Sequence, residues 1–178
     1  RGLGDVYKRQ PFYKFGDAIY LAKIETKYWI EYICKRFENT GKHISPELAE
    51  EICRLVDNHS SYVQQLSWLL WIRTINTATT EQLSYALEDL LDQNNILFQS
   101  ETENLSAYQM NFLKAIVDGI HTKFSSKEVI SKYNLGTSAN IVRLKNALLQ
   151  KELIETNGKE IVLADPVFEV WFKKEMLY

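Results

Sequence analysis

The chain has 178 residues, of which 46% are hydrophobic and 25% charged, and its formal net charge is −2 at pH 7. This composition predicts one or two packed domains and excludes a disordered chain. The near-neutral charge gives no overall attraction to nucleic acid or to an anionic membrane. The longest apolar run, residues 66–72, is far too short to span a bilayer. We therefore expect no membrane contact.

Residues 1–10, RGLGDVYKRQ, resemble a translated adapter from sequencing libraries. We interpret them as a non-native leader, with a flexible native leader as the alternative. Residues 17–24, DAIYLAKI, are apolar and suited to a buried strand. A buried strand needs ladder partners, and the rest of the sequence offers none here. We therefore expect residues 11–24 to be the last strand of a sheet that lies upstream.

Helical spacing of apolar residues predicts four helices over residues 25–98. The second is marked by Ser45 as N-cap with Pro46 at its first position, and the fourth by a Thr79–Gln82 capping box. The third, residues 60–74, is apolar nearly all round, so we expect it to be central in the bundle.

Residues 93–104 are polar and are interpreted as a linker that is helical at its start at most. The stretch that follows has the capping and turn signals of a winged helix-turn-helix domain. They predict three capped helices, a hairpin and a last helix. Its marks are the Ser106–Gln109 capping box, the N-caps Ser125 and Thr137, the Asn157-Gly158 turn, and Asp165 followed by Pro166.

The hairpin is expected to join strands at residues 153–156 and 160–163, with positive φ at both Asn157 and Gly158. The predicted fold is therefore mainly α, with a four-helix bundle at residues 25–98. A winged helix-turn-helix domain with a small β-hairpin follows at residues 99–178.

Five stretches in this order resemble the C-terminal region of bacterial AAA+ ATPases of the archaeal-ATPase-like group, within the STAND-related P-loop proteins. The form common in Bacteroidetes genomes is the one we identify. The stretches are PFYKFGDAIYL (11–21), DNHSSYVQQLSWLLW (57–71), ALEDLLDQN (86–94), LGTSANIVRLKNALLQKELI (135–154) and ADPVFEVWF (164–172).

The resemblance implies that residues 11–24 end a P-loop core and that residues 25–98 form a lid over the nucleotide. ATP and Mg²⁺ would then bind mainly to an upstream P-loop domain. The parent protein resembles an ATP hydrolase, whereas this chain alone would hold no cofactor and perform no catalysis.

Three residues are candidates to face the nucleotide. His59 and Ser60 begin the lid helix that relatives write Gly-His-Pro-x-x-x-Gln, with Ser60 where proline is usual. A helix start of this kind suits phosphate, because its N–H groups and dipole are positive. Lys14 lies where relatives often carry arginine. The alternatives are a capped helix with a surface imidazole, and a solvated lysine.

The sequence holds no G-x-x-x-x-G-K-[ST] loop. Gly41-Lys42 is followed by His43, and Arg36 stands where the first glycine should be. The histidines and cysteines lack metal-ligand spacing, so we predict neither a catalytic residue nor a metal site.

The tryptophans and cysteines are interpreted as core residues. Trp29, Trp68, Trp71 and Trp171 lie in helical apolar stripes, without a basic groove beside them. Two cysteines outside any CxxC pair fit small core residues in a reducing cytosol, with a redox pair as the alternative. We therefore expect a cytoplasmic protein.

The third helix of the winged-helix domain would be its recognition helix. Its candidate contacts to DNA or to a protein partner are Ser138, Asn140, Arg143, Lys145 and Asn146. Residues 101–178 carry ten Lys and Arg and ten Asp and Glu, so the basic footprint of a DNA-binding module is missing. This balance favours a protein contact or an intramolecular regulatory role over DNA.

Three functions remain in competition. The leading one is a nucleotide-switched region of an ATPase, in which the lid moves the winged helix. The face of the lid that packs on the upstream domain would then be apolar and exposed in this chain alone. The second is a stand-alone winged-helix DNA-binding transcriptional regulator. The third is a helical interaction module without a ligand.

Overall fold

A computed structural model describes residues 23–176 in two compact units. The helical unit comprises residues 23–105 and 165–176, and the winged-helix unit comprises residues 106–164. The predicted leader, Lys14 and all but the last two residues of the predicted strand lie outside the described residues. Between residues 23 and 176, no helix has the length and apolar character that a bilayer crossing requires.

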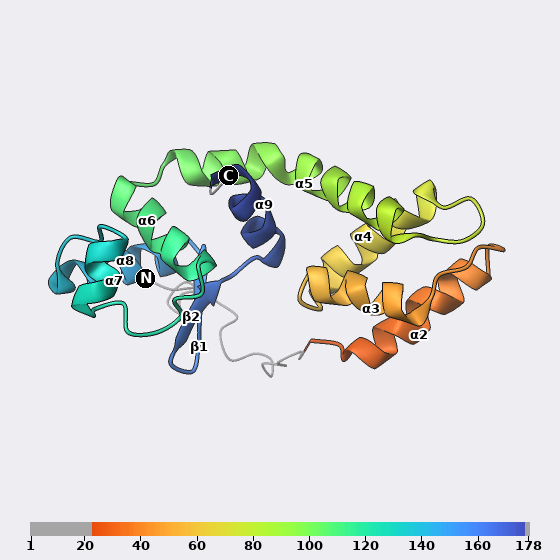
Figure 1. The fold of residues 1–178 in the computed structure, drawn as a ribbon, viewed down its shortest axis with the longest axis horizontal. Helices are drawn as coiled ribbons and strands as arrows, with labels where there is room; N and C mark the ends of the chain where they lie inside the picture. Colours follow the sequence, from red (N-terminus) through yellow and green to blue (C-terminus); the bar gives the residue numbers. More distant parts are fainter. Residues whose placement is uncertain (1–22, 177–178) are drawn as a thin grey trace, which may run out of the picture. The chain divides into compact units, whose positions relative to one another are not determined.

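The helical unit contains the four predicted helices and one more from the end of the chain (Figure 1). They are α2 (Thr26–Glu38), α3 (Pro46–Leu55), α4 (Ser60–Arg73), α5 (Thr80–Glu103) and α9 (Pro166–Met176). The predicted caps are confirmed. The Ser45 hydroxyl accepts the Leu48 N–H at 3.2 Å, and Thr79 and Gln82 form a reciprocal capping box.

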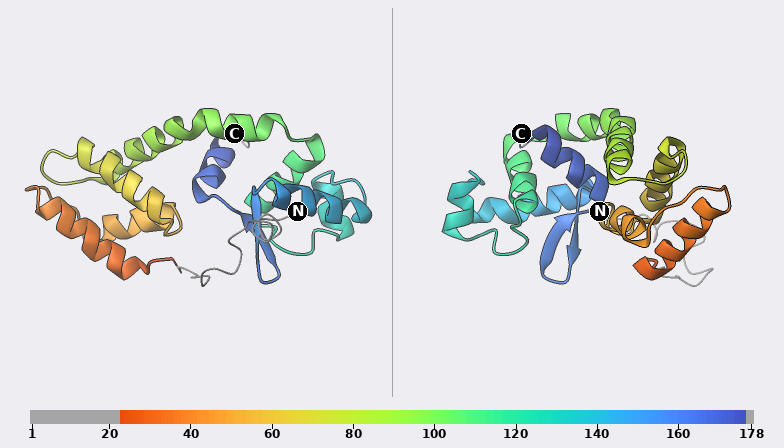
Figure 2. Two further views of the ribbon diagram at one scale, coloured as in Figure 1. Left: turned by 180° about the vertical axis from the view of Figure 1, so that it is seen from behind. Right: turned by 45° about the vertical axis from the view of Figure 1, so that its right-hand side comes forward.

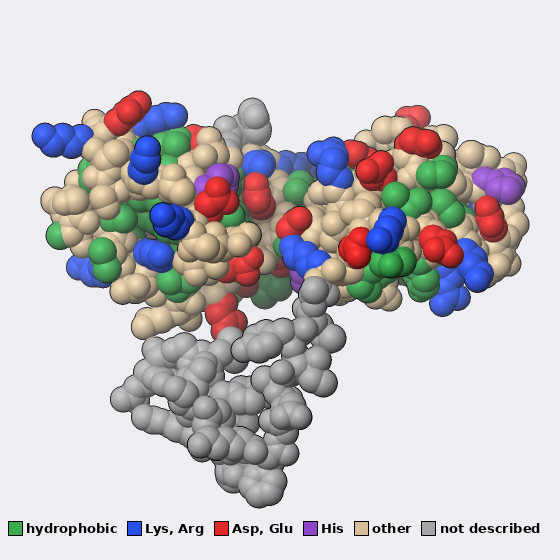
Figure 3. Space-filling model, turned by 90° about the horizontal axis from the view of Figure 1, so that it is seen from below, with side chains coloured by type: hydrophobic (Ala, Val, Ile, Leu, Met, Phe, Trp, Pro, Cys, Tyr) green, Lys and Arg blue, Asp and Glu red, His purple; other side chains and the backbone are tan. Residues whose placement is uncertain are grey.

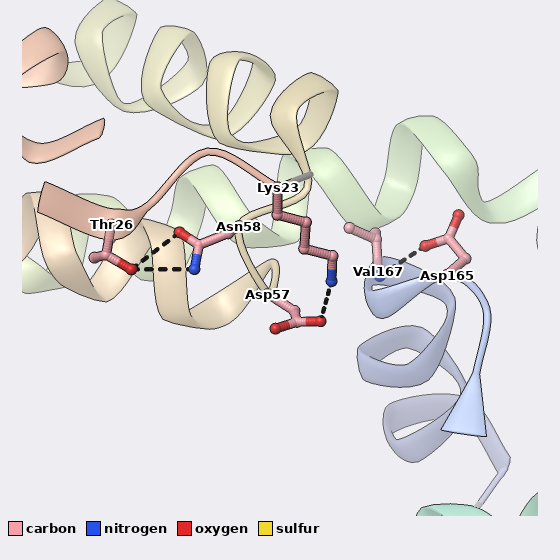
Figure 4. Close-up of polar contacts among 6 residues, drawn as sticks. All are labelled: Lys23, Thr26, Asp57, Asn58, Asp165 and Val167. Atoms are coloured by element: carbon pink, nitrogen blue, oxygen red, sulfur yellow. Dashed lines mark hydrogen bonds and ion pairs between the residues drawn. The ribbon is translucent and has the colours of Figure 1, made fainter. Parts of the chain in front are cut away.

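A tight turn joins α3 to α4. Asp57 and Asn58 adopt left-handed backbone conformations, with φ of 46° and 54°. Polar contacts hold this turn against the start of α2 (Figure 4): Lys23 pairs with Asp57, and the Asn58 amide bonds to the Thr26 hydroxyl. The conformation suits Asn and Asp, whose short side chains tolerate positive φ better than most others.

The linker predicted over residues 93–104 is wrong, because α5 continues without a break to Glu103 (Figures 1 and 2). The polar side chains bond back to helix carbonyls: Asn94 donates to Leu90 O at 2.8 Å and Thr102 to Phe98 O at 3.1 Å. Phe98, in the middle of the segment, is fully buried. Tertiary packing therefore overrides the turn-like composition.

Helix α9 packs against the second half of α5. The Asp165 carboxylate caps α9 by accepting the N–H groups of Val167 at 2.8 Å and Phe168 at 3.0 Å. Figure 4 shows the bond to Val167. The Phe98 ring of α5 lies 5.3 Å from that of Phe168 and 5.6 Å from that of Trp171. These aromatic contacts fix α9 in the helical unit.

Helix α4 is less enclosed than its apolar sequence predicts. Val63, Leu66, Leu69 and Leu70 are buried, but Trp68 is 55% exposed. The prediction that Trp68 lies in the core is therefore wrong. Trp29 and Trp171 are buried as predicted. The apolar residues of α4 lie on two faces of the helix. One face is buried in the unit, and the other, which carries Trp68, is exposed.

The winged-helix unit has the predicted order of three helices and a hairpin (Figure 1). Its elements are α6 (Ala107–Val117), α7 (Lys127–Lys132), α8 (Ser138–Gln150), β1 (Ile154–Asn157) and β2 (Glu160–Leu163). The strands are antiparallel, with Ile154 opposite Leu163. The buried residues of α6 and α8, such as Phe112 and Leu148, form the core of this unit.

Three local predictions in this unit need correction. Thr137 stands at the N-cap position of α8, but its side chain makes no capping hydrogen bond. The N-cap of α7 is Ser126, which accepts the Val129 N–H at 3.2 Å, and not Ser125. The hairpin pairs Asn157 with Glu160, so its two-residue loop is Gly158-Lys159. Only Gly158 has positive φ in this turn, at 62°. Glycine at the first loop position is typical of a type II′ turn, and it places Lys159 at the tip of the wing.

Candidate functional site

The start of α4 carries the two described residues that the resemblance assigns to the nucleotide. His59 is the N-cap residue, but no side chain caps this helix. Asn58, the alternative cap, is engaged by Thr26 instead. The exposed His59 imidazole lies against Tyr62, with 4.7 Å between ring centroids. The first N–H groups of α4 are thus left without a side-chain acceptor, as an anion site requires.

A half-buried acidic cluster lies one turn further along α4. The Tyr62 hydroxyl donates to the Asp165 carboxylate at 2.6 Å, which links α4 to the cap of α9. Burial and this hydrogen bond raise the pKa of the Tyr62 phenol. Burial, reinforced by the Asp165 charge, also raises the pKa of Glu101 on α5. This three-helix junction was missed by the sequence analysis, because Tyr62 and Asp165 are far apart in the chain.

An exposed apolar surface, here called the α2/α4 face, covers one side of the helical unit. It consists of Tyr28 and Tyr32 of α2 and Trp68, Trp71 and Ile72 of α4. All of these except Trp71 are more than 40% exposed. A groove of about 340 Å³ runs between the two helices, with Tyr32, Trp68 and Trp71 in its wall. A contiguous aromatic surface of this kind is typical of an interaction site.

Trp71 is held in a fixed position at this face. Its indole N–H donates to the Thr40 hydroxyl at 2.9 Å. The Lys42 ammonium lies 4.0 Å from the ring centroid and donates to the Trp71 carbonyl at 2.7 Å. Lys42, which the sequence excluded as the lysine of a phosphate loop, therefore holds Trp71 at the edge of the aromatic groove.

In the winged-helix unit, two of the five predicted contact residues of α8 bond to each other. The Asn140 amide oxygen accepts the Arg143 guanidinium at 2.7 Å, and the Asn140 amide N–H₂ donates to Leu135 O at 3.0 Å. Asn140 therefore braces the turn before α8, where Gly136 has a φ of 84°. Neither side chain is presented as a free reader of base edges.

Lys145 and Asn146 line a groove of about 430 Å³, here called the lysine groove. It runs between α8, the loop before α7 and the wing strand β2. Its polar lining residues are His121, Thr122, Lys123, Ser125, Lys145, Asn146 and Lys159, and its apolar ones are Phe124, Ile141, Val142 and Ile161. The fifth predicted contact, Ser138, is exposed but does not line it.

The sequence did not predict that His121, Lys123 and Lys159 line this groove. Their positions in a loop and a hairpin gave no periodic signal. The hairpin prediction could have identified Lys159 as a wing-tip residue, had the turn been assigned one position later.

The charge of the winged-helix unit differs from the sequence estimate. Residues 106–164 carry eight Lys and Arg against five Asp and Glu, a formal charge of +3. The neutral balance over residues 101–178 came from including the ends of the helical unit, namely Glu101, Glu103 and residues 165–178. The unit defined by its packing therefore carries a small positive charge, which the count over residues 101–178 cancelled.

No group of three His, Cys, Asp or Glu side chains among residues 23–176 is arranged to hold a metal ion. The thiols of Cys34 and Cys53 are both free.

Comparison with known proteins identifies the second unit. Residues 96–174 match the family model described as "Probable winged helix domain". The match includes the end of α5 and most of α9, as well as the helices and hairpin between them. The mainly helical chain thus contains a winged-helix domain with a small antiparallel hairpin.

The fold is also similar to that of a Walker-type ATPase of Pyrococcus abyssi, with a TM-score of 0.65 and 18% sequence identity. The similarity covers 85% of this chain and 42% of the ATPase, so this chain spans less than half of that protein's length. At this identity the similarity concerns the fold alone. No curated protein matches the sequence.

Proposed function

We propose that this chain is the C-terminal helical and winged-helix region of an ATP-binding protein of the Walker type. Its α2/α4 face would pack against an upstream ATP-binding domain. The observation that carries the proposal is that face itself, an aromatic surface beside a groove of about 340 Å³. The fold similarity to a Walker-type ATPase, which extends over both units, supports the same assignment.

The exposure of the α2/α4 face favours a large protein partner. Trp68 and Ile72 occupy neighbouring positions on α4, and they are 55% and 51% exposed. Because each side chain is already about half covered, a partner that covered the rest would add roughly half of the 1.5–3 kcal/mol that full burial contributes. Lys42 and Thr40 already hold Trp71, so little side-chain entropy would be lost there on binding.

The nucleotide would be held mainly by the upstream domain, because the 178-residue sequence lacks a phosphate-binding loop. The described residues fit only an accessory role toward ATP and Mg²⁺. The uncapped start of α4 would add backbone N–H groups near Ser60, with His59 beside them. Lys14 remains a second proposed contact, on the basis of the resemblance.

In this role the helical unit is a lid that senses the nucleotide, and AAA+ or STAND-related ATPases of the Bacteroidetes type are the group we propose for the parent. Closing the lid would move α4, and the Tyr62–Asp165 bond would pass that movement to α9. The free thiols fit a reducing, cytoplasmic location.

The proposal is tested by Trp68→Glu in the intact gene product. A charge at the centre of the apolar face should separate the two domains and lower the rate of ATP hydrolysis by about tenfold or more. Leu97→Glu is the matched control, because Leu97 of α5 is similarly exposed at 56% but lies outside the α2/α4 face. Hydrolysis at the wild-type rate by Trp68→Glu would remove the α2/α4 face as the docking surface.

A further inference from the structure

The aromatic groove between α2 and α4 has a lining of unusual charge. A second hollow of about 350 Å³ continues the groove of about 340 Å³ toward Ile24, at the start of α2, because Tyr32 and Gln64 line both. Among the described residues that line the two hollows, Arg36 is the one charged side chain. The groove therefore contains a cation and no carboxylate.

This lining contrasts with the rest of the helical unit. Residues 23–105 and 165–176 carry nine Lys and Arg against sixteen Asp and Glu, a formal charge of −7. Figure 3 shows Asp and Glu side chains at several places on the right-hand part of the molecule, which contains the helices α2 to α4. Acidic residues are thus common on this unit, yet none of the described ones lines the groove.

Arg36 is held at the groove without a counter-ion. Its guanidinium carbon lies 5.2 Å from the centroid of the Tyr32 ring, which is one helical turn earlier on α2. Within residues 23–176 it takes part in no salt bridge, and the five ion pairs found there involve other cations of the helical unit. A guanidinium positioned in this way is ready to bind a carboxylate, which its planar fork matches.

Most other polar groups of the groove are satisfied within the unit. The Gln64 amide donates to Ser60 O at 3.2 Å. The Ser67 hydroxyl donates to Val63 O at 2.6 Å. The buried indole N–H of Trp29, by contrast, has no acceptor among the described residues. The groove thus presents a positive charge and hydrogen-bond donors, so a complementary partner must supply acceptors.

The walls and the charge restrict the kind of partner. A polyanion such as nucleic acid does not fit, because one arginine cannot offset the −7 charge of the unit. Strand pairing does not fit either, since the walls are helices whose backbone groups bond within each helix. An amphipathic helix fits a groove between two helices, and the 13 residues of α2 offer it a length of about 20 Å, or about four turns.

We propose that the part of the upstream domain that covers the α2/α4 face is an amphipathic helix with an Asp or Glu whose carboxylate pairs with Arg36. The apolar side chains of this helix lie against Trp68 and Trp71, and the carboxylate sets its position along the groove. The inference rests on the proposed function, because it names the chemistry of the segment that docks on this face. It adds that docking depends on charge as well as on apolar contact.

Site-specific cross-linking in the intact gene product identifies the docked segment. The photoreactive residue p-benzoylphenylalanine replaces Tyr28, an exposed aromatic residue of the same face, and the site of the cross-link is mapped by mass spectrometry. We expect an intramolecular cross-link to an upstream segment with apolar residues three and four apart. An Asp or Glu should lie about two turns from the cross-linked residue, since Tyr28 and Arg36 are about 12 Å apart along α2. A segment without an acid, a second copy of the chain as the cross-linked partner, or no cross-link would overturn the proposal.

The same cross-link measures the charge pairing. Arg36→Glu should lower its yield about tenfold or more, because two carboxylates then face each other. Lys35→Glu is the matched control: both residues are exposed cations in the last turn of α2, so both changes oppose its dipole alike, but Arg36 lines the groove and Lys35 does not. Replacing the mapped acid by lysine in the Arg36→Glu variant should restore the yield to within about twofold. Equal yields from the two glutamate variants would overturn the proposal.

The Trp68→Glu variant separates this inference from the proposed function. Wild-type hydrolysis and cross-linking in Trp68→Glu would remove the α2/α4 face as the docking surface, and both proposals would fail. A cross-link that is lost in Trp68→Glu but kept in Arg36→Glu would leave the docking surface in place and overturn the carboxylate pairing alone. The melting temperatures of Arg36→Glu and Lys35→Glu should agree, because both side chains are exposed and neither contributes to the core.

Discussion

Replacing Trp171 by alanine tests whether α9 is a structural part of the helical unit. The Trp171 side chain is 2% exposed, and its ring lies 5.6 Å from that of Phe98 and 5.7 Å from that of Phe168. Its indole N–H donates to the Asn95 amide oxygen at 2.8 Å. The substitution removes the largest fully buried side chain of the chain's described part.

The expected loss can be worked out from these contacts. Truncating a buried tryptophan to alanine costs about 3–5 kcal/mol, because transfer and cavity terms add. The Asn95 oxygen also loses its donor, which costs about 1 kcal/mol. We therefore expect the free energy of unfolding of the helical unit to fall by about 4 kcal/mol or more, a large part of the 5–15 kcal/mol typical of a domain. Trp171→Phe keeps a ring in place and should cost about half as much.

The assay is urea unfolding followed by circular dichroism, with Trp68→Ala as the matched control. Trp68 is the same residue type on a neighbouring helix but is 55% exposed, so its removal should cost about 0.5 kcal/mol or less. Equal losses for the two alanine variants would refute the packing of α9 on α5. A loss below about 1 kcal/mol for Trp171→Ala would refute it as well.

Two further predictions concern the half-buried Tyr62 and the buried Cys53 of the helical unit. Tyr62→Phe should lower the free energy of unfolding by about 1.5 kcal/mol, because the charged Asp165 loses its hydroxyl donor; an unchanged urea midpoint would contradict this bond. Burial raises the pKa of Cys53 from the ordinary 9.0 to about 11. The thiol is protonated in both states below about pH 9, so its contribution to stability is constant there and is lost as the pH rises toward about 11. Cys53→Ala should weaken that decline, and identical pH profiles would show that the thiol is not buried as described.

The sequence predicted the starts of α3 and α5 well because their determinants are local. The Ser45–Pro46 start of α3 and the Thr79–Gln82 capping box require only residues within one turn, so the pattern and the structure agree. The register of the hairpin was less secure. Asn157-Gly158 is a strong turn signal, yet cross-strand pairing moved the loop by one residue to Gly158-Lys159.

The features that sequence reasoning missed depend on contacts between distant segments. The polar stretch after Asp92 is helical because Phe98 is covered by Phe168 and Trp171, which lie some seventy residues later. The same packing places α9 in the helical unit, and this changes the charge balance of the winged-helix unit. Trp68 was assigned to the core because periodicity identifies an apolar face without showing what covers it.

The identity of the segment upstream of Pro11 tests the central claim most directly, and reading the genomic DNA before that codon measures it. We expect a single open reading frame that encodes a G-x-x-x-x-G-K-[ST] loop ahead of this chain. A frame that starts near Pro11, or an upstream segment without such a loop, would contradict the assignment to a Walker-type ATPase.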